Sequence, residues 1–542
     1  VQDTITVINT ADQRIIGHVD LRDTPGAGAS FHQHFQARGL AVTEDNTRLY
    51  VTRFLSLTKP GGRQGDDFGK EGMVAVLDIN TTSTSIDDYR TARAITLAPQ
   101  ITGFRFPGTD QDTGAFPNQL QSIVIRGDRA YLPNIAASPS GPLRFNLDTQ
   151  AFVNQLGSVN STAPTDLGAL NLHLGARDPE PGKTKLFFAN PWAIAFTTQS
   201  GAGSAYAVSA GSDLLVKLNV AADGLLGFTV DNDTTRYIDL NDPDNPMTSG
   251  ANAGKNPQGI AITSDGTRAY VANFVSRNVS VLDLTTDSVI ASVPASDLPA
   301  PGSQGEMNLV GAEVFFSSRG NFDSVPGSTG SLRNRLSSDG WQSCASCHFK
   351  GLTDGVIWQF GAGPRKSVSL NSSFNPHNRD QQRLLNYSAI FDEIEDFELN
   401  IRNVSGPGNL ATPINGNPLD PTHGLLIGDN GDIGLAPGAV NAFGIPNANR
   451  PQVTVTPPGS PNQIPALTAM REWVRFAVRT PNGKLPGLPG SHPPDFIADG
   501  RRLFAQAGCA NCHGGQNWTT SLKDFTSPPA SPEINTERSP TP

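Results

Sequence analysis

The apolar residues of the first three hundred positions occur in short runs broken by turn residues, a pattern that indicates β-strands. Residues 257–293 read PQGIAITSDGTRAYVANFVSRNVSVLDLTTDSVIASV. This stretch holds four strand-sized runs, rich in β-branched and aromatic residues, with turns such as Ser264-Asp265-Gly266 between them. The pattern therefore predicts one antiparallel sheet of four strands.

The same text recurs earlier in the chain. Residues 39–51 read GLAVTEDNTRLYV, and Gly39 is as far from Tyr50 as Gly259 is from Tyr270. After an insertion, VAVLDINTTS matches VSVLDLTTDS of the later copy, and weaker copies surround two further tyrosines, Tyr131 and Tyr206. Repetition of one four-stranded unit predicts a β-propeller.

The two ends of this region predict how the propeller closes. The chain opens with ITVINTADQRIIGHV, which matches the second half of the unit. We expect MNLVGAEVFF at 307–316 to supply the first half, because pairing the first and last strands in one blade removes the exposed edges. The fold class predicted is mainly β, with an N-terminal propeller of about seven blades, and at least five, over residues 1–304. This text resembles the YVTN family of β-propellers over residues 1 to about 318, a resemblance that implies fold and not function.

Composition and charge exclude several kinds of partner. The chain has 542 residues, which is too long for one ordinary domain, and a formal net charge of −10. An acidic chain has no strong positive field, so we expect no nucleic-acid partner. No stretch approaches the roughly 20 apolar residues of a membrane helix, so we expect no membrane span. The chain begins with Val1, and we expect any secretion signal to have been removed.

The cysteines carry the most specific pattern. All four lie in two C-x-x-C-H motifs: Cys344, Cys347, His348 and Cys509, Cys512, His513. This is the attachment pattern of c-type haem, in which two thiols a helical turn apart bond the vinyl groups and the histidine is the proximal iron ligand. We therefore predict two covalently attached haem c groups. Haem c is attached outside the cytoplasm, which predicts a periplasmic, extracellular or cell-surface location.

Two other interpretations of the thiol pairs are weaker. A redox-active dithiol does not require the histidine that follows each pair. A shared zinc site would need both pairs to converge on one ion, although 161 residues separate Cys347 from Cys509. Haem attachment is the prediction that uses every cysteine and both histidines.

The sequences around both motifs resemble the bacterial di-haem cytochrome c peroxidase and MauG family, over residues 305 to about 525. Examples are GAEVFF before the first motif and GRRLFAQAG before the second. The resemblance implies a mostly α-helical di-haem domain at 305–526, with the first haem at 305–404, a Gly/Pro/Asn-rich connection at 405–465 and the second haem at 466–526. Residues 527–542 form a Pro-rich tail. In this family the first haem reduces peroxide and the second is a His/Met electron acceptor.

The distal iron ligands are predicted less directly. The resemblance implies a methionine downstream of the second motif, but no Met or His follows His513. We take His377 as the candidate distal ligand of the first haem, and Met470, with His423 and His492 as competitors, for the second. The family's catalytic glutamate has no match in RNVSGPGNL, so the catalytic residues stay unassigned. Trp358 and Trp473 are predicted to be packing residues, with a bridge between haems as the alternative.

Several other patterns have a structural explanation. Apolar residues at three- and four-residue steps predict helices at 383–402 and around Leu467, Met470 and Val474. The acidic run from Asp392 to Glu398 is interpreted as a solvated face. Asp-rich loops at 239–246 and 428–434 could bind Ca²⁺, although turn formation explains both.

These observations leave two main functional hypotheses of different classes, with a propeller enzyme that oxidises a small molecule and exports electrons through the haems as a weaker third. The first is a di-haem cytochrome that transfers electrons, with peroxide reduction or oxidation of a partner at the first haem; whether it is an enzyme stays open. The second is a binding or structural propeller module whose haems relay electrons between neighbouring subunits. Both imply a redox partner protein or a neighbouring subunit.

Overall fold

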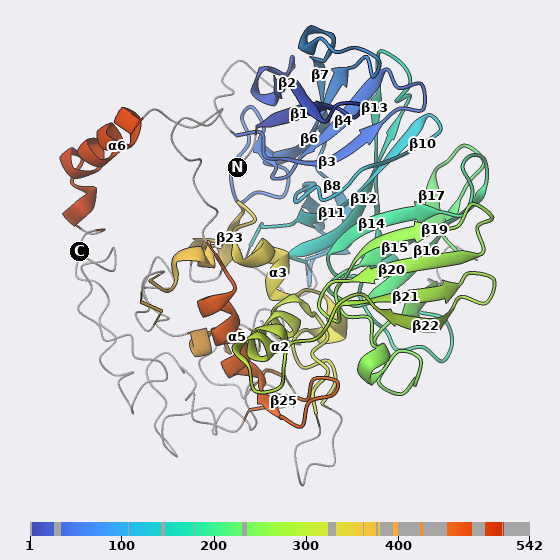
Figure 1. Cartoon of the computed structure of the whole chain (residues 1–542), viewed down its shortest axis with the longest axis vertical. Helices are drawn as coiled ribbons and strands as arrows, with labels where there is room; N and C mark the ends of the chain where they lie inside the picture. Colours follow the sequence, from blue (N-terminus) through green and yellow to red (C-terminus); the bar gives the residue numbers. More distant parts are fainter. Residues whose placement is uncertain are drawn as a thin grey trace.

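The protein is mainly β, with antiparallel sheets and few helices, in the computed structural model shown in Figure 1. The structure describes residues 3–26, 34–106, 108–141, 147–177, 179–229, 236–323, 332–360, 363–375, 378–379, 394–398, 401, 423–425, 452–479, 494–511 and 513. None of the described helices has both the length and the apolar character needed to cross a membrane.

Four sheets of four or five strands follow one another around an arc (Figure 1). The first sheet contains β3 (Ala37–Val42), β4 (Arg48–Arg53), β6 (Lys70–Asp78), β7 (Arg90–Leu97) and the short β5 (Leu57–Thr58). The second contains β10 (Val124–Arg126), β11 (Arg129–Ala137), β12 (Thr149–Gly157) and β13 (Thr165–Asn171). The third contains β14 (Pro191–Phe196), β15 (Gly203–Ser209), β16 (Leu214–Val220), β17 (Leu226–Phe228) and β18 (Arg236–Asp239). The fourth contains β19 (Pro257–Ile262), β20 (Arg268–Asn273), β21 (Asn278–Asp283) and β22 (Ser288–Pro294).

Smaller elements flank the arc. Two-stranded sheets are formed by β1 (Thr4–Asn9) with β2 (Arg14–Asp20), β8 (Gln100–Arg105) with β9 (Asp112–Ala115), β23 (Ile357–Phe360) with β24 (Gly363–Lys366), and β25 (Thr454–Val455) with β26 (Ile464–Pro465). The helices are α1 (Leu172–Gly175), α2 (Gln304–Phe316), α3 (Cys344–Cys347), α5 (Ala466–Phe476) and α6 (Pro494–Gln506). Short 3-10 turns include η7 (Ile394–Phe397) and η9 (Cys509–Asn511).

The repeats predicted from the sequence are confirmed as repeated structure. The strands of the fourth sheet coincide with the four runs of residues 257–293, and 39–51 forms β3 and β4. Both copies make the same turn: the hydroxyl of Thr43 donates to Asp45 at 2.6 Å, and that of Thr263 donates to Asp265 at 2.6 Å. The region is therefore propeller-like, with successive antiparallel sheets built from one repeated unit.

The repeated tyrosines join each sheet to the next. The Tyr50 hydroxyl of the first sheet donates to the Val159 carbonyl beyond β12 at 2.7 Å. Tyr131 of the second sheet donates to the Gly224 carbonyl at 2.7 Å, and Tyr206 of the third donates to the Asp287 carboxylate at 2.6 Å. Three of the four repeated tyrosines thus bond to the neighbouring sheet, and the fourth, Tyr270, is exposed.

Among the described residues, the fourth sheet packs against another sheet on one face only. In β11 and β12 nearly every side chain is buried, because sheets cover both faces. In β20 buried and exposed side chains alternate, and Tyr270 is 44% exposed. About seven blades, and at least five, were expected; the described residues show four sheets of four or five strands, and the β1–β2 hairpin packs on the first of these.

These tyrosines give a matched pair of variants. Tyr131→Phe should lower the free energy of unfolding by about 1 kcal/mol or more, because it leaves the Gly224 carbonyl without its donor in a buried place. Tyr270→Phe should change it very little, since that side chain is exposed. Urea unfolding of both variants measures the difference; equal effects would contradict the bridging role.

The expected closure by residues 307–316 is wrong. These residues form most of α2, a helix that packs along α5 instead of adding a strand to a blade. Gly311 lets the two backbones approach, since a Cβ there would lie 2.0 Å from the Ala469 carbonyl oxygen. The rings of Phe315 and Trp473 lie 4.3 Å apart across the same contact. The helix predicted around Leu467, Met470 and Val474 is confirmed as α5.

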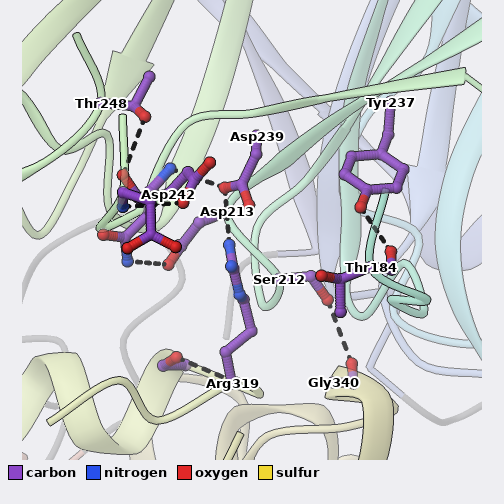
Figure 2. A network of polar contacts seen from close by, with 12 residues as sticks. Thr184, Ser212, Asp213, Tyr237, Asp239, Asp242, Thr248, Arg319 and Gly340 are labelled. Atoms are coloured by element: carbon purple, nitrogen blue, oxygen red, sulfur yellow. Dashed lines mark hydrogen bonds and ion pairs between the residues drawn. The ribbon is translucent and has the colours of Figure 1, made fainter. Parts of the chain in front are cut away.

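A polar network fixes the segment after α2 to the third sheet (Figure 2). Arg319, almost fully buried, forms a 2.7 Å ion pair with Asp239 at the end of β18. The Ser212 hydroxyl lies 2.9 Å from that of Ser318 and donates to the Gly340 carbonyl at 3.1 Å. Figure 1 shows the consequence: α2, α3 and α5 gather on the inner side of the arc, whereas α6 stands apart from it.

Candidate functional site

The first C-x-x-C-H motif forms one helical turn. Cys344 and Cys347 are the first and last residues of α3, so both thiols lie on the same side of the turn, and neither forms a disulfide. The His348 amide donates to the Cys344 carbonyl at 2.9 Å and places the imidazole directly after the thiols. The motif thus presents two thiols and one imidazole together.

The imidazole of His348 has a defined orientation and tautomer. Its Nδ1 lies 2.9 Å from the Val368 carbonyl oxygen, which can only accept, so Nδ1 carries the proton. Burial lowers the pKa of His348, which keeps the ring neutral. Nε2 therefore carries a lone pair. A backbone carbonyl that holds the far nitrogen is the usual support of a metal-ligating histidine.

The thiols lie among apolar side chains. Cys347 packs with Phe116, Val356 and Trp358, and Cys344 packs against the cluster that contains Met470 and Trp473. Burial raises the pKa of Cys344 to about 11 and that of Cys347 well above its ordinary value. Both thiols are protonated at neutral pH, whereas redox-active dithiols have lowered pKa values.

Amide side chains of the propeller-like region hold this motif from outside. The Gln119 amide donates to the Ser346 carbonyl at 2.6 Å. Asn190 accepts from the Ser346 hydroxyl at 2.6 Å and donates to that of Ser343 at 2.8 Å. These residues were missed in the sequence, because their partners lie more than 150 positions away.

A structural repeat identifies the position of these amides. Gln36, Asn190 and Asn256 each directly precede a sheet's first strand, and Gln119 lies five residues before β10. All four have a positive φ, between 49° and 58°. Asn tolerates this left-handed conformation better than most residues. The Asn-Pro pairs at 190–191 and 256–257 were the available sequence signal for it.

Next to Cys347, the segment after α3 carries a buried carboxyl group. Asp354 accepts from the Val356 amide at 2.9 Å and from the Trp358 indole at 3.0 Å. Burial raises the pKa of Asp354 to about 7. The predicted packing role of Trp358 is confirmed, since its side chain is buried against Phe116.

The second motif repeats the backbone turn of the first. The His513 amide donates to the Cys509 carbonyl at 2.8 Å, the counterpart of the bond between His348 and Cys344. The helix α6 lies just before this turn in the sequence. The helix α2 likewise lies before the first motif, but more residues separate them. His513 is exposed, and Cys512 lies outside the described residues. The second motif is therefore the solvent-facing one.

The candidate distal ligands fall in different places. Met470, on the buried side of α5, belongs to the same apolar cluster as Cys344 of the first motif, although it was predicted for the second haem. His423 lies partly buried, and its carbonyl accepts from Arg335 at 3.3 Å. His377 and His492 lie outside the described residues. All four assignments stay predictions.

The acidic run was wrongly interpreted as a wholly solvated face. Glu398 is fully buried, and its carboxylate accepts from the Leu425 amide at 2.8 Å. Of the predicted helix at 383–402, the structure describes only 394–398 and 401, and 394–397 is a 3-10 turn. A backbone donor explains why one carboxylate of the run turns inward.

The Asp-rich loop at 239–246 uses its carboxylates within the protein. Asp239 pairs with Arg319, Asp244 pairs with Arg333 at 2.6 Å, and Asp242 accepts from the Asp244 amide at 3.0 Å. The loop at 428–434 lies outside the described residues. Over the described ranges, no three His, Cys, Asp or Glu side chains are grouped to hold a metal ion. Calcium binding stays a prediction.

A buried acid beside the first motif predicts a pH dependence. Burial raises the pKa of Asp148 to about 7, above its ordinary value of 3.8. Its stabilising contribution is thus complete below pH 3.8 and is lost as the pH rises through about 7. Asp148→Asn should remove a fall of about 1.4 kcal/mol per pH unit from the unfolding free energy across this range.

Urea unfolding between pH 5 and pH 8 measures this slope. The control is Asp110→Asn, on an exposed loop, which should retain the wild-type slope. An Asp148→Asn variant with the wild-type slope would contradict the assignment.

The comparisons with known proteins show little. The sequence matches no family profile and no curated protein. Similar solved structures include a putative 6-phosphogluconolactonase from Bacteroides fragilis (TM-score 0.31, 12% identity, covering 54% of this chain and 64% of that chain). Others are the periplasmic gluconolactonase of Pseudomonas aeruginosa (0.26, 14%, 54% and 77%) and hydrazine synthase of Kuenenia stuttgartiensis (0.23, 15%, 52% and 89%). The match spans less than two-thirds of the first of these proteins, and no activity follows for this chain.

Proposed function

We propose that this chain is an extracytoplasmic di-haem c-type cytochrome that transfers electrons. One haem is attached at Cys344, Cys347 and His348, and the other at Cys509, Cys512 and His513. The observation that carries the proposal is the 2.9 Å bond from His348 Nδ1 to the Val368 carbonyl, which leaves Nε2 as a ligand beside two free thiols.

The chemistry of the first motif fits haem better than its rivals. A zinc site would need about four ligands at one point, whereas in the described parts of the chain no three His, Cys, Asp or Glu side chains are grouped to hold a metal ion. A redox dithiol needs thiolates, and burial holds both thiols protonated. An apolar lining around two thiols and a neutral imidazole suits a porphyrin. When bound, haem iron supplies one-electron oxidation and reduction.

The chain's own residues position and shield the first haem. Gln119 and Asn190, which precede the first strands of the second and third sheets, hold α3 through Ser343 and Ser346. Phe116, Trp358 and Trp473 pack around the partly buried thiols. The propeller-like region would thus be a scaffold that limits the access of water to the first haem, which would limit reorganisation during electron transfer.

The second motif is the place for exchange with a partner. Its histidine and most described residues of α6 are exposed, so a haem attached there is open to a redox partner protein or a neighbouring subunit. Reduction of peroxide, or oxidation of the partner, at the first haem is part of the same proposal if its sixth position can open. This arrangement implies a periplasmic or extracellular protein.

Optical and spin-state spectra of the purified protein test the proposal. We expect c-type α-bands on reduction by dithionite and full reoxidation by a soluble oxidant. A high-spin haem that turns over peroxide would identify a peroxidase, and two low-spin haems inert to peroxide would identify a carrier. A protein without haem absorption, purified from a host that attaches haem c, would refute the proposal.

A further inference from the structure

A cavity of about 190 Å³ lies where the first sheet meets the segment that follows the first motif. Its walls come from both parts of the chain: Gln36, Arg53, Leu55, Ser56, Thr58, Gln64 and Lys70 on one side, and Gly355 and Lys366 on the other. The lining contains three cationic side chains and no carboxylate. Its chemistry is therefore that of an anion receptor.

Two of the cations are buried, which makes their charge costly without a counter-ion. Arg53 is 4% exposed and Lys70 is 6% exposed. The ammonium of Lys70 donates to the Gly355 carbonyl at 3.0 Å, and the guanidinium of Arg53 donates to the His34 carbonyl at 3.1 Å. The Lys70 ammonium is thus held by a neutral oxygen, which does not cancel its positive charge, whereas the Asp3 carboxylate lies close enough to Arg53 to favour its charged form.

The carboxyl group that acts on Lys70 is engaged by other donors. Asp354, one residue before Gly355, accepts from the Trp358 indole and the Val356 amide. Burial lowers the pKa of Lys70 to about 8; the positive charges of Arg53 and Lys366 act in the same direction, and the Asp354 carboxyl group opposes them. The cavity thus gathers three cations, and the two nearby acids, Asp354 and Asp3, are not part of its lining.

Neutral groups in the wall add hydrogen-bonding capacity. Ser56 is 6% exposed, and among the described residues its hydroxyl has no hydrogen-bond partner. The same holds for the side-chain oxygen of Gln36. Gln36 occupies the repeat position from which Gln119 and Asn190 bind α3, but here the side chain faces the cavity. A buried hydroxyl without a partner is the donor that an oxyanion would use.

We propose that this cavity binds a carboxylate or a phosphate-like oxyanion, held by Lys70, Arg53, Lys366 and the Ser56 hydroxyl. The anion comes from one of two sources. It is either a free anion or a propionate of the haem at the first motif, since Lys366 lies two residues before Val368, whose carbonyl holds His348. The propionate source rests on the proposed function, whereas the free-anion source does not.

Calorimetric titration of the full-length holoprotein with inorganic phosphate tests whether the cavity binds a free anion. Saturable binding to the wild type should weaken about tenfold in Lys70→Met, equivalent to about 1.4 kcal/mol, and by less in Lys366→Gln. Lys366 is exposed, so its substitution leaves the fold intact even if the loss of Lys70 does not. The matched control is Arg90→Gln, which also removes one positive charge. Arg90 is an exposed residue of β7 in the same sheet, so this variant should bind phosphate like the wild type.

The midpoint potential of the first haem tests the other source. If a propionate fills the cavity, phosphate does not bind, and Lys70→Met and Lys366→Gln lower the potential because a cation beside the haem is lost. Arg90→Gln leaves the potential unchanged. Absence of phosphate binding together with unchanged potentials in both lysine variants would overturn the proposal. If the protein carried no haem, the proposed function would fail while the phosphate titration still decided the anion site.

Discussion

Replacing Cys344 and Cys347 together with alanine should leave a protein that carries one haem instead of two. The two thiols are the only covalent anchors that α3 offers, and both belong to apolar clusters where alanine is tolerated sterically. Haem content per polypeptide, measured from the pyridine haemochrome spectrum and the protein concentration, gives the ratio. The remaining haem should be the exposed one, attached at Cys509 and Cys512.

The mirror-image variant is the control for this experiment. Cys509→Ala with Cys512→Ala should also carry one haem, but the buried one, since His513 is exposed and His348 is not. The retained haem should therefore react with a small reductant more slowly than the retained haem of the first variant. Two haems in either variant, or none in the wild type, would contradict the attachment sites.

The segment after α2 contacts the arc of sheets through Arg319. Among single substitutions at this contact, Arg319→Met should lower the free energy of unfolding most. The guanidinium pairs with Asp239 at 2.7 Å and lies close to the buried carboxyl of Asp213, as Figure 2 shows. Removal of one partner of a buried pair costs about 3–5 kcal/mol, because the other charge is left without compensation. We expect a marked shift of the first unfolding transition in urea to lower concentration.

The same segment offers a matched surface pair. Arg333 binds Asp244 of the neighbouring loop at 2.6 Å, but both side chains are exposed to solvent. Arg333→Met should therefore change stability little, since water and salt screen such pairs. Arg319→Met with Asp239→Leu should recover part of the loss, because the Asp239 charge is no longer left unpaired; the buried Asp213 carboxyl group still lacks its nearby cation. Equal effects at the two arginines would show that the buried network does not fix the segment.

The strands of the propeller-like region could be predicted from the sequence because each one carries a local pattern. The apolar runs of 257–293 and the turn around Asp265 fix both strand limits and the hairpin without distant contacts. The tyrosines could be found as a repeat, but their function could not. A hydroxyl bond from Tyr131 to Gly224 joins residues 93 positions apart. Such a contact leaves no local trace.

Residues 307–316 were predicted to supply strands of a blade, but they form most of the helix α2. MNLVGAEVFF has apolar residues on every side, because α5 covers one face and the loop at Val275 packs near another. A helix covered on several sides loses the amphipathic period by which helices are predicted. Its start was nevertheless encoded: the Ser303 hydroxyl accepts from the Glu306 amide at 3.2 Å, and Glu306 accepts from the Gly302 amide.

The candidate site also has one part that could be predicted from the sequence and another that could not. The grouping of two thiols and a histidine in one turn could be predicted, because the C-x-x-C-H spacing is local; haem attachment there stays a prediction. The supports of the motif could not, since Gln119, Asn190 and the Val368 carbonyl reach it through the tertiary fold. The cavity at Lys70 could not be predicted from the sequence either, because its cations come from segments almost three hundred residues apart.

The intact mass of the wild-type polypeptide, purified from a bacterium that attaches haem c, tests the central claim most directly. We predict a mass increase equal to two haem groups, with peptide fragments that place one at Cys344 and Cys347 and one at Cys509 and Cys512. An unmodified polypeptide, or a protein that contains zinc and no iron, would contradict the account.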